Sequence, residues 1–558
     1  MKMVSFALLC AGLMAVSGAK ANDIGNDMST GYGWYLNYDW LNQIVNNTPT
    51  KNVMCPTLEV DSALTTDYKV ALQNSFYANA TGSIGKWFPK NEVWAAFSMG
   101  PMVNNFGITF GKVRTLKELE NEKRKKLPTT VRELNKWDVK DSAYWESQGG
   151  VSFYLGTGTE PISVGVFAVA TGGWANYLEK TAPTKVYVER AKKYVKMINV
   201  GAGAFYTSVG ADAVIEKAKG FNYEFDISRP ENAEAFERFM AGETTKAYDL
   251  SRIEGSGVVK IADTTLSKFG KSFGVSLSTP FIPIISLRGS QGKDYNHEEE
   301  LSVWDEHVVK DYGVYTKQSA SRLVGLHYKR ERSFKGGMTS TATGPVLAKE
   351  TSVKFYGQFK HAYQSDWGQE GRLENQIDYA KDIAGFDKEA ETCVKVPNFA
   401  NSLKYNQVIL QMNLSDEYMR AILGLGNNST AFLNKLQARA SYLDGNIKSL
   451  ANCSSSYDPN NASGQDRACR GNSVDGAFLG IKKAVAQIKA SMGRDRNGFS
   501  AGMANFGKAV WSNPGVFKAF YEQGKTCGMD FSFEVSGQRI NRFYKNQKYG
   551  YTPSCVNN

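Results

Sequence analysis

Apolar and polar positions alternate along much of the chain between Gly149 and Leu414. A period of two residues with one polar face is typical of antiparallel strands that are half-exposed to water. Leu301–Tyr315 and Leu323–Phe334 are long enough for each to form one extended strand of a large curved sheet. The apolar members of the clearest stretches are Tyr223, Phe225 and Ile227; Phe273, Val275 and Leu277; Val353, Phe355 and Phe359; and Val408, Leu410, Met412 and Leu414.

Two of these segments make specific predictions. Within Val353–Tyr363, the residues expected to face a protein core are Val353, Phe355 and Phe359, and those expected to face water are Lys354, Gln358 and Lys360. Ile162–Gly172 has apolar or small residues on both faces, which predicts a strand buried on both sides.

Capping signals predict short helices between the strands. Ser228 with Glu231 three residues later forms a capping box, and Gly242 predicts the end of that helix. Ser415 and Gly424 take the same roles around a second short helix. The order of strand, serine, helix and glycine therefore occurs twice, which hints at a duplicated unit.

The period becomes helical between Ser415 and Gly524, where apolar residues recur at spacings of three and four. Thr115–Lys126 predicts a further, highly charged helix, and alternation returns at Phe531, Phe533 and Val535. We therefore expect an α+β fold in which a large antiparallel β-sheet system dominates, with a helical segment near the C-terminus and a final β-hairpin.

The N-terminus has the features of a secretory signal peptide. Lys2 gives a positive n-region, Phe6–Val16 is apolar, and Ala19 and Ala21 suit cleavage before Asn22. No later run approaches the roughly 18 apolar residues of a spanning helix. We therefore expect an exported protein without a transmembrane helix in the mature chain, located in the periplasm, at the outer membrane or in the medium.

These patterns divide the chain into successive regions. The expected regions are a signal peptide at 1–21, an N-terminal mixed region at 22–148, a β-rich domain with inserted short helices at 149–414, a helical region at 415–526, and a C-terminal hairpin closed by a disulfide at 527–558.

The mature chain is basic, because removal of Lys2 and Lys20 lowers the net charge only from +11 to +9. We expect anionic lipid, a glycan or an envelope protein as the partner, and no nucleic acid, because an exported basic protein meets those partners first. Two clusters are candidates for a basic surface, although a solvated helix end and an exposed strand edge are the simpler interpretation. They are Lys123, Arg124, Lys125 and Lys126, and Lys329, Arg330, Arg332 and Lys335.

Six cysteines remain once Cys10 leaves with the signal peptide. An even number in an oxidising compartment indicates disulfides, and six cysteines allow fifteen pairings. A turn-rich loop and the C-terminal hairpin would each be closed by one bond, and the third would tie the N-terminal part to the β-rich domain. The expected pairs are Cys453 with Cys469, Cys527 with Cys555, and Cys55 with Cys393.

Catalytic and nucleotide-binding motifs each fail at a residue. Gly498–Gly502 has the spacing of a hydrolase nucleophile elbow, but a helical pattern precedes it and no histidine follows His361. Ser500 is therefore expected to cap the next helix. Gly270–Ser272 lacks the first glycine of a phosphate-binding loop, because Thr265 occupies its place.

Metal-ligand patterns fail as well. The four histidines do not fall at helical ligand spacing, and no two cysteines are separated by two residues. Asp458, Asn460 and Asp466 could donate oxygens to calcium, but Pro459 and the spacing favour a disulfide-closed surface loop. We therefore expect neither a metal nor another cofactor.

These observations favour a non-catalytic envelope protein that uses a large β surface to bind lipid, a glycan or another envelope protein. The alternative is an outer-membrane β-barrel or pore, whose strands alternate over about ten residues. The helical region and the lack of a terminal aromatic strand argue against this alternative. A secreted glycan-acting hydrolase is a third class, because acids are plentiful and a two-carboxylate cleft is compatible with the sequence.

Overall fold

The computed structural model describes most of the chain, and the statements below concern those residues. The described residues are 28–44, 57–61, 68–88, 93–113, 128–159, 162–204, 207–278, 286–302, 306–323, 326–344, 350–366, 403–425, 429–444, 473–526, 529–539 and 542–550.

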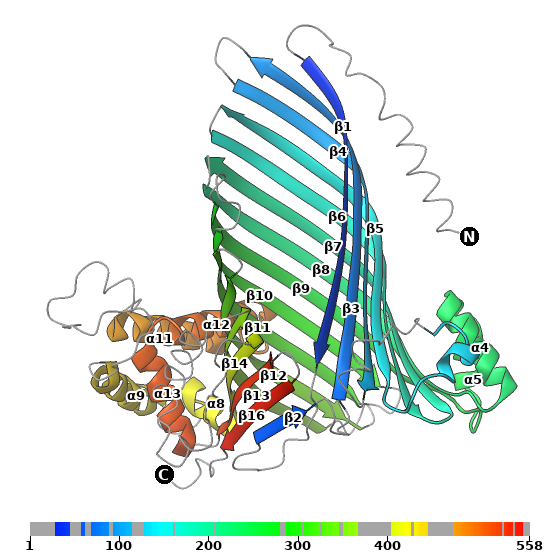
Figure 1. The fold of residues 1–558 in the computed structure, drawn as a ribbon. Coiled ribbons are helices and arrows are strands. Elements are labelled where there is room, and N and C mark those ends of the chain that lie inside the picture. Colours follow the sequence, from blue (N-terminus) through cyan, green and yellow to red (C-terminus); the bar gives the residue numbers. More distant parts are fainter. Residues whose placement is uncertain are drawn as a thin grey trace.

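The described strands form one antiparallel sheet of sixteen, so the predicted α+β fold with a dominant antiparallel sheet is confirmed (Figure 1). The strands are β1 (Met28–Ile44), β2 (Thr57–Asp61), β3 (Tyr68–Phe88), β4 (Val93–Val113), β5 (Ser142–Thr159), β6 (Ile162–Ala182), β7 (Lys185–Ala204), β8 (Thr207–Asp226), β9 (Val258–Ser278), β10 (Ser286–Ser302), β11 (His307–Leu323), β12 (Leu326–Thr343), β13 (Glu350–Asp366), β14 (Leu403–Leu414), β15 (Met529–Arg539) and β16 (Arg542–Gly550). Their spatial order follows the sequence, except that β2 lies beside β16 at the far edge from β1.

The described helices occur in two groups. The first contains α3 (Val131–Leu134), α4 (Pro230–Ala241) and α5 (Thr245–Ser251). The second contains α8 (Asp416–Leu423), α9 (Ser429–Asp444), α11 (Val474–Ser491), α12 (Arg496–Val510) and α13 (Pro514–Thr526), after which β15 and β16 return to the sheet.

Two long strands expected from the alternation begin later than predicted, because each predicted start crosses a chain reversal. Leu301 near the end of β10 pairs with His307 at the start of β11, and Leu323 at the end of β11 pairs with Leu326. Each predicted strand is therefore present as part of β11 or β12, but its predicted start is wrong because the first residues belong to the preceding strand. Alternation survives the reversal because residues directly opposite each other lie on the same face of the sheet.

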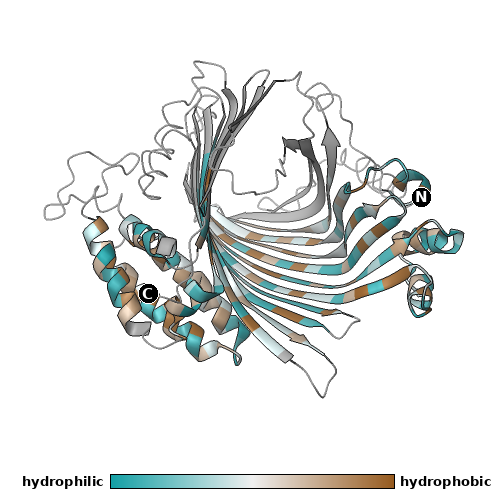
Figure 2. Ribbon diagram, turned by 90° about the horizontal axis from the view of Figure 1, so that it is seen from below, coloured by the Kyte–Doolittle hydropathy of each residue, from teal (hydrophilic) through white to brown (hydrophobic). Residues whose placement is uncertain are grey.

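Cross-strand register divides the side chains of the sheet between two faces. Both groups of helices pack on one face, which includes Val188 of β7 and Phe359 of β13; we call it the helical face. The other face includes Glu189 and Lys360, and we call it the open face. Figure 2 shows the hydropathy alternating along the strands, with the C-terminal helices on the outer side of the bend in the sheet.

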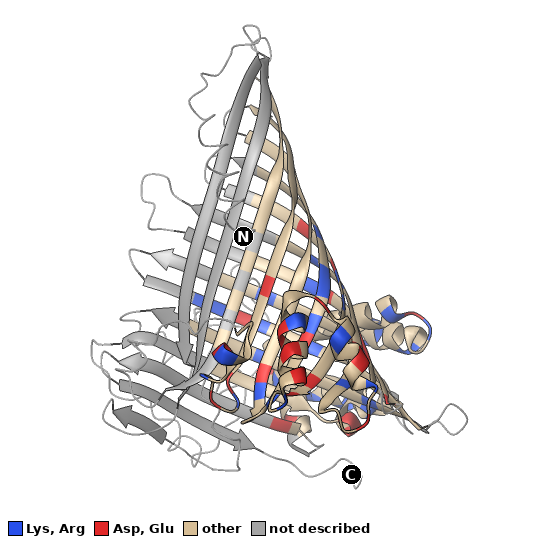
Figure 3. Cartoon of the chain, turned by 90° about the vertical axis from the view of Figure 1, so that its right-hand side faces the viewer, with Lys and Arg blue, Asp and Glu red and all other residues tan. Residues whose placement is uncertain are grey.

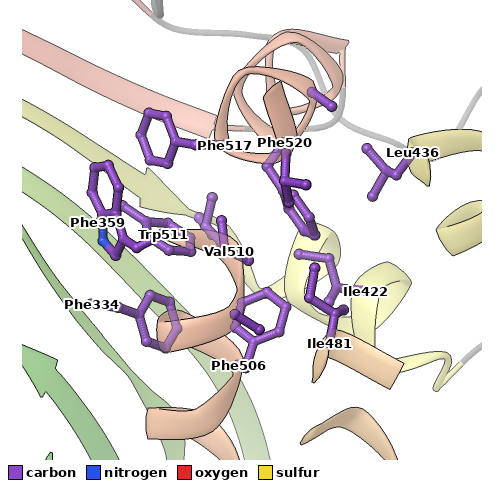
Figure 4. Close-up of a cluster of buried hydrophobic side chains, with 14 of the residues drawn as sticks. Phe334, Phe359, Ile422, Leu436, Ile481, Phe506, Val510, Trp511, Phe517 and Phe520 are labelled. Atoms are coloured by element: carbon purple, nitrogen blue, oxygen red, sulfur yellow. The ribbon is translucent and has the colours of Figure 1, made fainter. Parts of the chain in front are cut away.

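The C-terminal helices cover β10–β15 through a large aromatic core (Figure 4). The ring centroids of Phe334 and Phe359 lie 4.5 Å apart, and those of Phe359 and Phe517 lie 5.6 Å apart. Trp511 stacks on Phe517 at 4.2 Å. Such a core buries enough apolar surface to fix the helical segment on this part of the sheet.

Helix α12 approaches the sheet closely because glycine occupies both sides of the contact. A Cβ atom on Gly313 of β11 would lie 1.9 Å from the carbonyl oxygen of Ser500, and one on Gly507 would lie 2.3 Å from Cβ of Phe334. A larger residue at either position would push α12 away from the sheet.

The prediction for Val353–Tyr363 is confirmed at Phe355 and Phe359 but wrong at Val353, which is 36% exposed and lies beyond the C-terminal core. Phe355 is 3% exposed and Phe359 is fully buried in the C-terminal core. Lys354 is exposed on the open face. Strand β13 therefore uses its apolar side against protein.

The first helical group covers the opposite part of the same face, at one end of β6–β9. Phe236 and Phe239 of α4 are fully buried against Phe225, with ring centroids 5.9 Å and 5.5 Å away. Arg190 of β7 donates a 2.7 Å hydrogen bond to the carbonyl oxygen of Phe239 and lies over the Trp174 ring. These contacts hold α4 on the end of the sheet.

The capping predictions are confirmed for one helix and corrected for another. Ser415 accepts a hydrogen bond from the Tyr418 amide, and Gly424 ends α8 in the left-handed conformation. Helix α4 also ends at a left-handed glycine, Gly242, but the capping box at its start is wrong. The hydroxyl of Ser228 instead donates to Asp226, and α4 begins at Pro230.

Candidate functional site

The helical face is not covered along its whole length. At the ends of β4–β9 away from α4, apolar side chains project from this face and none of the described helices packs on them. Leu155 is 50% exposed and Ile198 is 52% exposed. We call this surface the bare apolar zone; it consists of Phe97, Met99, Val151, Leu155, Ile162, Val164, Ile198, Val200, Val209, Ile215, Phe269 and Phe273.

Cross-strand pairing joins the apolar residues of neighbouring strands, although Lys196 of β7 and Lys271 of β9 are exposed on the same face beside Ile215 and Phe273. Val166 of β6 lies directly opposite Val200 of β7, which lies opposite Ala211 of β8, which in turn lies opposite Phe273 of β9. Exposed apolar patches of this extent mark surfaces that contact another apolar phase.

This zone overturns the expectation that Ile162–Gly172 is a strand buried on both faces. The segment is part of β6, but Ile162 is 53% exposed and Val164 is 46% exposed. Apolar and small residues on both faces predict that neither face of the strand contacts water, which in a soluble sheet means burial in protein. Here the apolar side chains of the helical face have no described protein layer over them.

Lysines and aromatic residues border the zone on the side of α4. Trp174 lies opposite Lys192, which lies opposite Lys219, and Tyr194 lies opposite Lys217 in the adjacent row. Like charges directly opposite each other repel, so this row is suited to an anionic partner. Figure 3 shows that charged residues concentrate toward the helix-bearing end of the described sheet, whereas the far end is mostly uncharged.

The open face of the same strand ends is small and polar. Asp212 of β8 accepts hydrogen bonds from Asn199 of β7 and, at 2.9 Å, from Ser272 of β9. Glycines at 165 and 201 lie opposite each other beside this cluster. The two faces therefore differ sharply, with apolar side chains on one side and hydrogen-bonding groups on the other.

A groove of about 410 Å³ lies on the open face, closer to the helix-bearing end. Small side chains on neighbouring strands, including Ala175, Ala191 and Ala218, form part of its lining. Tyr144 and Tyr187 contribute aromatic rings to the same lining. Five glutamates and two lysines also line the groove, which makes it acidic in a basic protein.

The charges in the groove are unevenly paired. Lys193 lies 2.9 Å from Glu146 and 2.9 Å from Glu216, which balances those two carboxylates in part. Burial, with repulsion from Glu300 and Glu298, raises the pKa of the Glu189 carboxyl above its ordinary value. Excess carboxylate on a concave surface favours a cationic ligand.

The structure separates the second basic cluster. Lys329 and Lys335 lie on the open face of β12, whereas Arg330 and Arg332 lie on the helical face, where Arg332 sits over the Trp511 ring at 5.7 Å. Strand β12 lies between β11 and β13, so the interpretation of this cluster as an exposed sheet edge is wrong. A dense run of charges in a strand is divided between faces because its period is two.

The other candidate residues lie outside the described part of the chain. This holds for Lys123, Arg124, Lys125 and Lys126, for the predicted helix at 115–126, for the turn-rich loop around Asp458, and for the six cysteines of the mature chain.

The hydrolase motif does not assemble a nucleophile among the described residues. Ser500 is 2% exposed in the middle of α12, so its predicted role as a cap is wrong; the N-cap is Asp495. The His297 ring lies between Asp311 Oδ1 at 2.8 Å and the Arg496 guanidinium at 2.9 Å. The Ser500 hydroxyl instead lies 3.5 Å from the Asn296 carbonyl oxygen.

Among the residues that the structure describes, no group of three or more histidines, cysteines and acids is arranged to hold a metal ion. Within the same residues, no helix is both long and apolar enough to cross a membrane.

No model of a known protein family matches the sequence, and no curated protein matches it. The functional inferences therefore rest on the geometry of the two faces of the sheet.

Sequence reasoning missed the bare apolar zone and the groove for different reasons. The signal for the zone was present in Ile162–Gly172, but burial in protein and burial in lipid leave the same apolar pattern. The groove combines residues of seven strands, from Tyr144 in β5 to Lys310 in β11, and only the register brings them together.

Proposed function

We propose that the protein is a non-catalytic envelope protein that binds lipid by inserting the bare apolar zone into a bilayer. The single observation that carries this proposal is the large exposed apolar surface on β4–β9, where Ile162, Ile198 and Val200 are each about half exposed. Lipid tails would remove this surface from water at roughly 25 cal/mol per Å².

The size of the zone fits a bilayer better than a small protein contact. Along β6 the zone extends from Ala170 to Ile162, which spans about 26 Å at roughly 3.3 Å per residue. The apolar band of membrane-inserted strands is about 25 Å tall, and tilt reduces the height that a strand spans. The length therefore suits strands that reach across most of the hydrocarbon layer.

The border of the zone fits the interface of a membrane. Tyr194 and Trp174 carry amphipathic rings, which favour the level of the lipid headgroups. Lys192, Lys217 and Lys219 are exposed beside them and can bind lipid phosphates. This arrangement favours anionic lipid over a glycan or a second protein as the partner.

On the inserted strands, the open face lies opposite the lipid-facing side and is suited to contact with water. Asn199, Asp212 and Ser272 hydrogen-bond with one another there. Alternation of lipid-facing and water-facing residues is the pattern of strands that line an aqueous pore, which was the alternative expected from the sequence. The proposal therefore joins lipid binding with that transmembrane alternative and places both helical groups outside the inserted strand ends.

The proposal includes the cellular location of the protein. A cleaved signal peptide at 1–21 would deliver the chain to the periplasm, from which an outer membrane or another envelope membrane is accessible. Cleavage leaves a net charge of +9, which favours anionic membranes.

Replacing Lys192, Lys217 and Lys219 with glutamine should weaken binding to vesicles that contain anionic lipid. Each lysine near a membrane surface contributes about 1 kcal/mol, so the triple variant should bind on the order of 100-fold less tightly at low salt. Vesicle flotation at increasing fractions of anionic lipid measures the effect.

Lys329 and Lys335 provide the control, because they are two lysines on the open face of β12, to be compared per charge with the three lysines of the border. Their double glutamine variant should float like the unaltered protein. Equal losses in the two variants would show that net charge alone governs binding, and no loss in the triple variant would refute the role of the border.

A further inference from the structure

We propose that the acidic groove on the open face binds a linear organic polycation of the polyamine class. The site lies on β5–β11 toward the end of the sheet that carries α4, away from the bare apolar zone. Its ligand would be held by carboxylates along the groove, by an unpaired amide oxygen in its wall, and by tyrosine rings.

The carboxylates supply a charge that the described lysines do not balance. Glu189, Glu298 and Glu300 line the groove, and none of them forms an ion pair with a lysine or arginine among the described residues. Lys310 lies opposite Glu298 in the register, and the Tyr312 hydroxyl donates a hydrogen bond to Glu298. A cation with several separated charges can reach carboxylates that a single ion cannot reach together.

Asn222 gives an independent indication of a ligand. Its side chain lines the groove directly opposite Glu189, and the residue is 3% exposed. Its Oδ1 atom has no hydrogen-bond partner within the described part of the chain. A buried acceptor is costly unless it is satisfied, and an ammonium group is a donor that would satisfy it beside the Glu189 carboxylate.

The lining also distinguishes a polyamine from a metal ion. The described acids of the groove do not converge on one point with metal-ligand geometry. Ala175, Ala191 and Ala218 offer an apolar floor for methylene groups, and the rings of Tyr144 and Tyr187 can stack against ammonium groups. A volume of about 410 Å³ is that of a small-molecule site.

This inference is independent of the proposed insertion into a bilayer, because the groove lies on the opposite face of the sheet. A polyamine site would add selectivity for organic cations on the water-facing side of the sheet. Binding is measured on the full chain in detergent, where contact of the bare apolar zone with a bilayer plays no part.

Calorimetric titration of the full chain with spermidine tests the site. We expect saturable binding, and Glu189→Gln and Glu300→Gln should each weaken it about tenfold through loss of a charged hydrogen bond. Asn222→Ala should weaken binding, whereas Asn222→Asp should restore or tighten it, which a purely structural role of Asn222 would not produce.

Glu254→Gln is the matched control, because Glu254 is exposed beyond α5 and does not line the groove. The affinity of the Glu254→Gln variant for spermidine should equal that of the unaltered chain. Glutamine preserves the shape of glutamate and removes mutual repulsion, so thermal unfolding should show both groove variants folded. Absence of binding, equal affinity for magnesium ions alone, or equal effects in the groove and control variants would each overturn the assignment.

Discussion

Replacing Phe359 with alanine should lower the free energy of unfolding by about 3–5 kcal/mol, the usual loss for a buried phenylalanine. Phe359 is fully buried, and its ring contacts those of Phe334, Trp511 and Phe517. The cavity would lie at the centre of the contact between the sheet and the C-terminal helices. Denaturant unfolding followed by tryptophan fluorescence measures the loss.

Lys354→Ala is the control for this substitution, because Lys354 lies on the same strand and is exposed on the open face. Its effect should stay within about 0.5 kcal/mol. A loss below about 1 kcal/mol for Phe359→Ala would mean that the helices do not pack on β13 as described.

Arginine at Val200 should destabilise the membrane-bound protein by about 2–4 kcal/mol, the range for a charge placed on the lipid face of an inserted strand. Val200 is 46% exposed at the centre of the bare apolar zone. In water such a surface position would tolerate the change, so the loss arises only from contact with lipid. Urea unfolding from vesicles measures it.

Asn199→Arg separates the effect of lipid from the effect of a larger, charged side chain. Asn199 precedes Val200 but lies on the open face, where Asp212 can pair with the new guanidinium. This variant should lose less than about 1 kcal/mol. Equal losses at the two positions would argue against a lipid-facing side.

The sequence predicted the fold class because its strongest signals are periodic. Phe355 and Phe359 alternate with lysine, and the structure buries both phenylalanines as expected. Ser415 and Gly424 carry local chemistry that fixes the ends of α8. Local rules of this kind depend only on nearby residues and can be read from one sequence.

Several predictions failed where a neighbouring residue took over the predicted role or the chain reversed direction. The capping box at Ser228 was lost because Asp226 accepts its hydroxyl hydrogen bond, and Ser500 lies inside α12 because Asp495 begins the helix earlier. Leu301 and His307 show that alternation continues across a hairpin. In each case, a competing local partner or a chain reversal determined where a helix or strand begins, which the hydrophobic period alone does not determine.

The candidate surfaces were harder to predict than the fold. Exposure of Ile162 and Val164 depends on where the helices stop, and α4 covers only one end of β6–β9. The groove requires Glu189 and Glu300, which are distant in the sequence and lie on strands separated by two others. Neither arrangement has a local signature in the sequence.

The most direct measurement is the accessibility of Ile198 and Asn199 in vesicles that contain the protein. Single-cysteine variants at these adjacent positions are treated with a lipid-phase maleimide and with a water-soluble maleimide. The unaltered chain gives the background labelling. Ile198 faces the bare apolar zone and Asn199 faces the open face. Phe355, buried in the C-terminal core, provides a site that both reagents should miss. The account predicts that the lipid-phase reagent labels position 198 and the water-soluble reagent labels position 199. Labelling of position 198 by the water-soluble reagent, with none from the lipid phase, would contradict insertion of the zone.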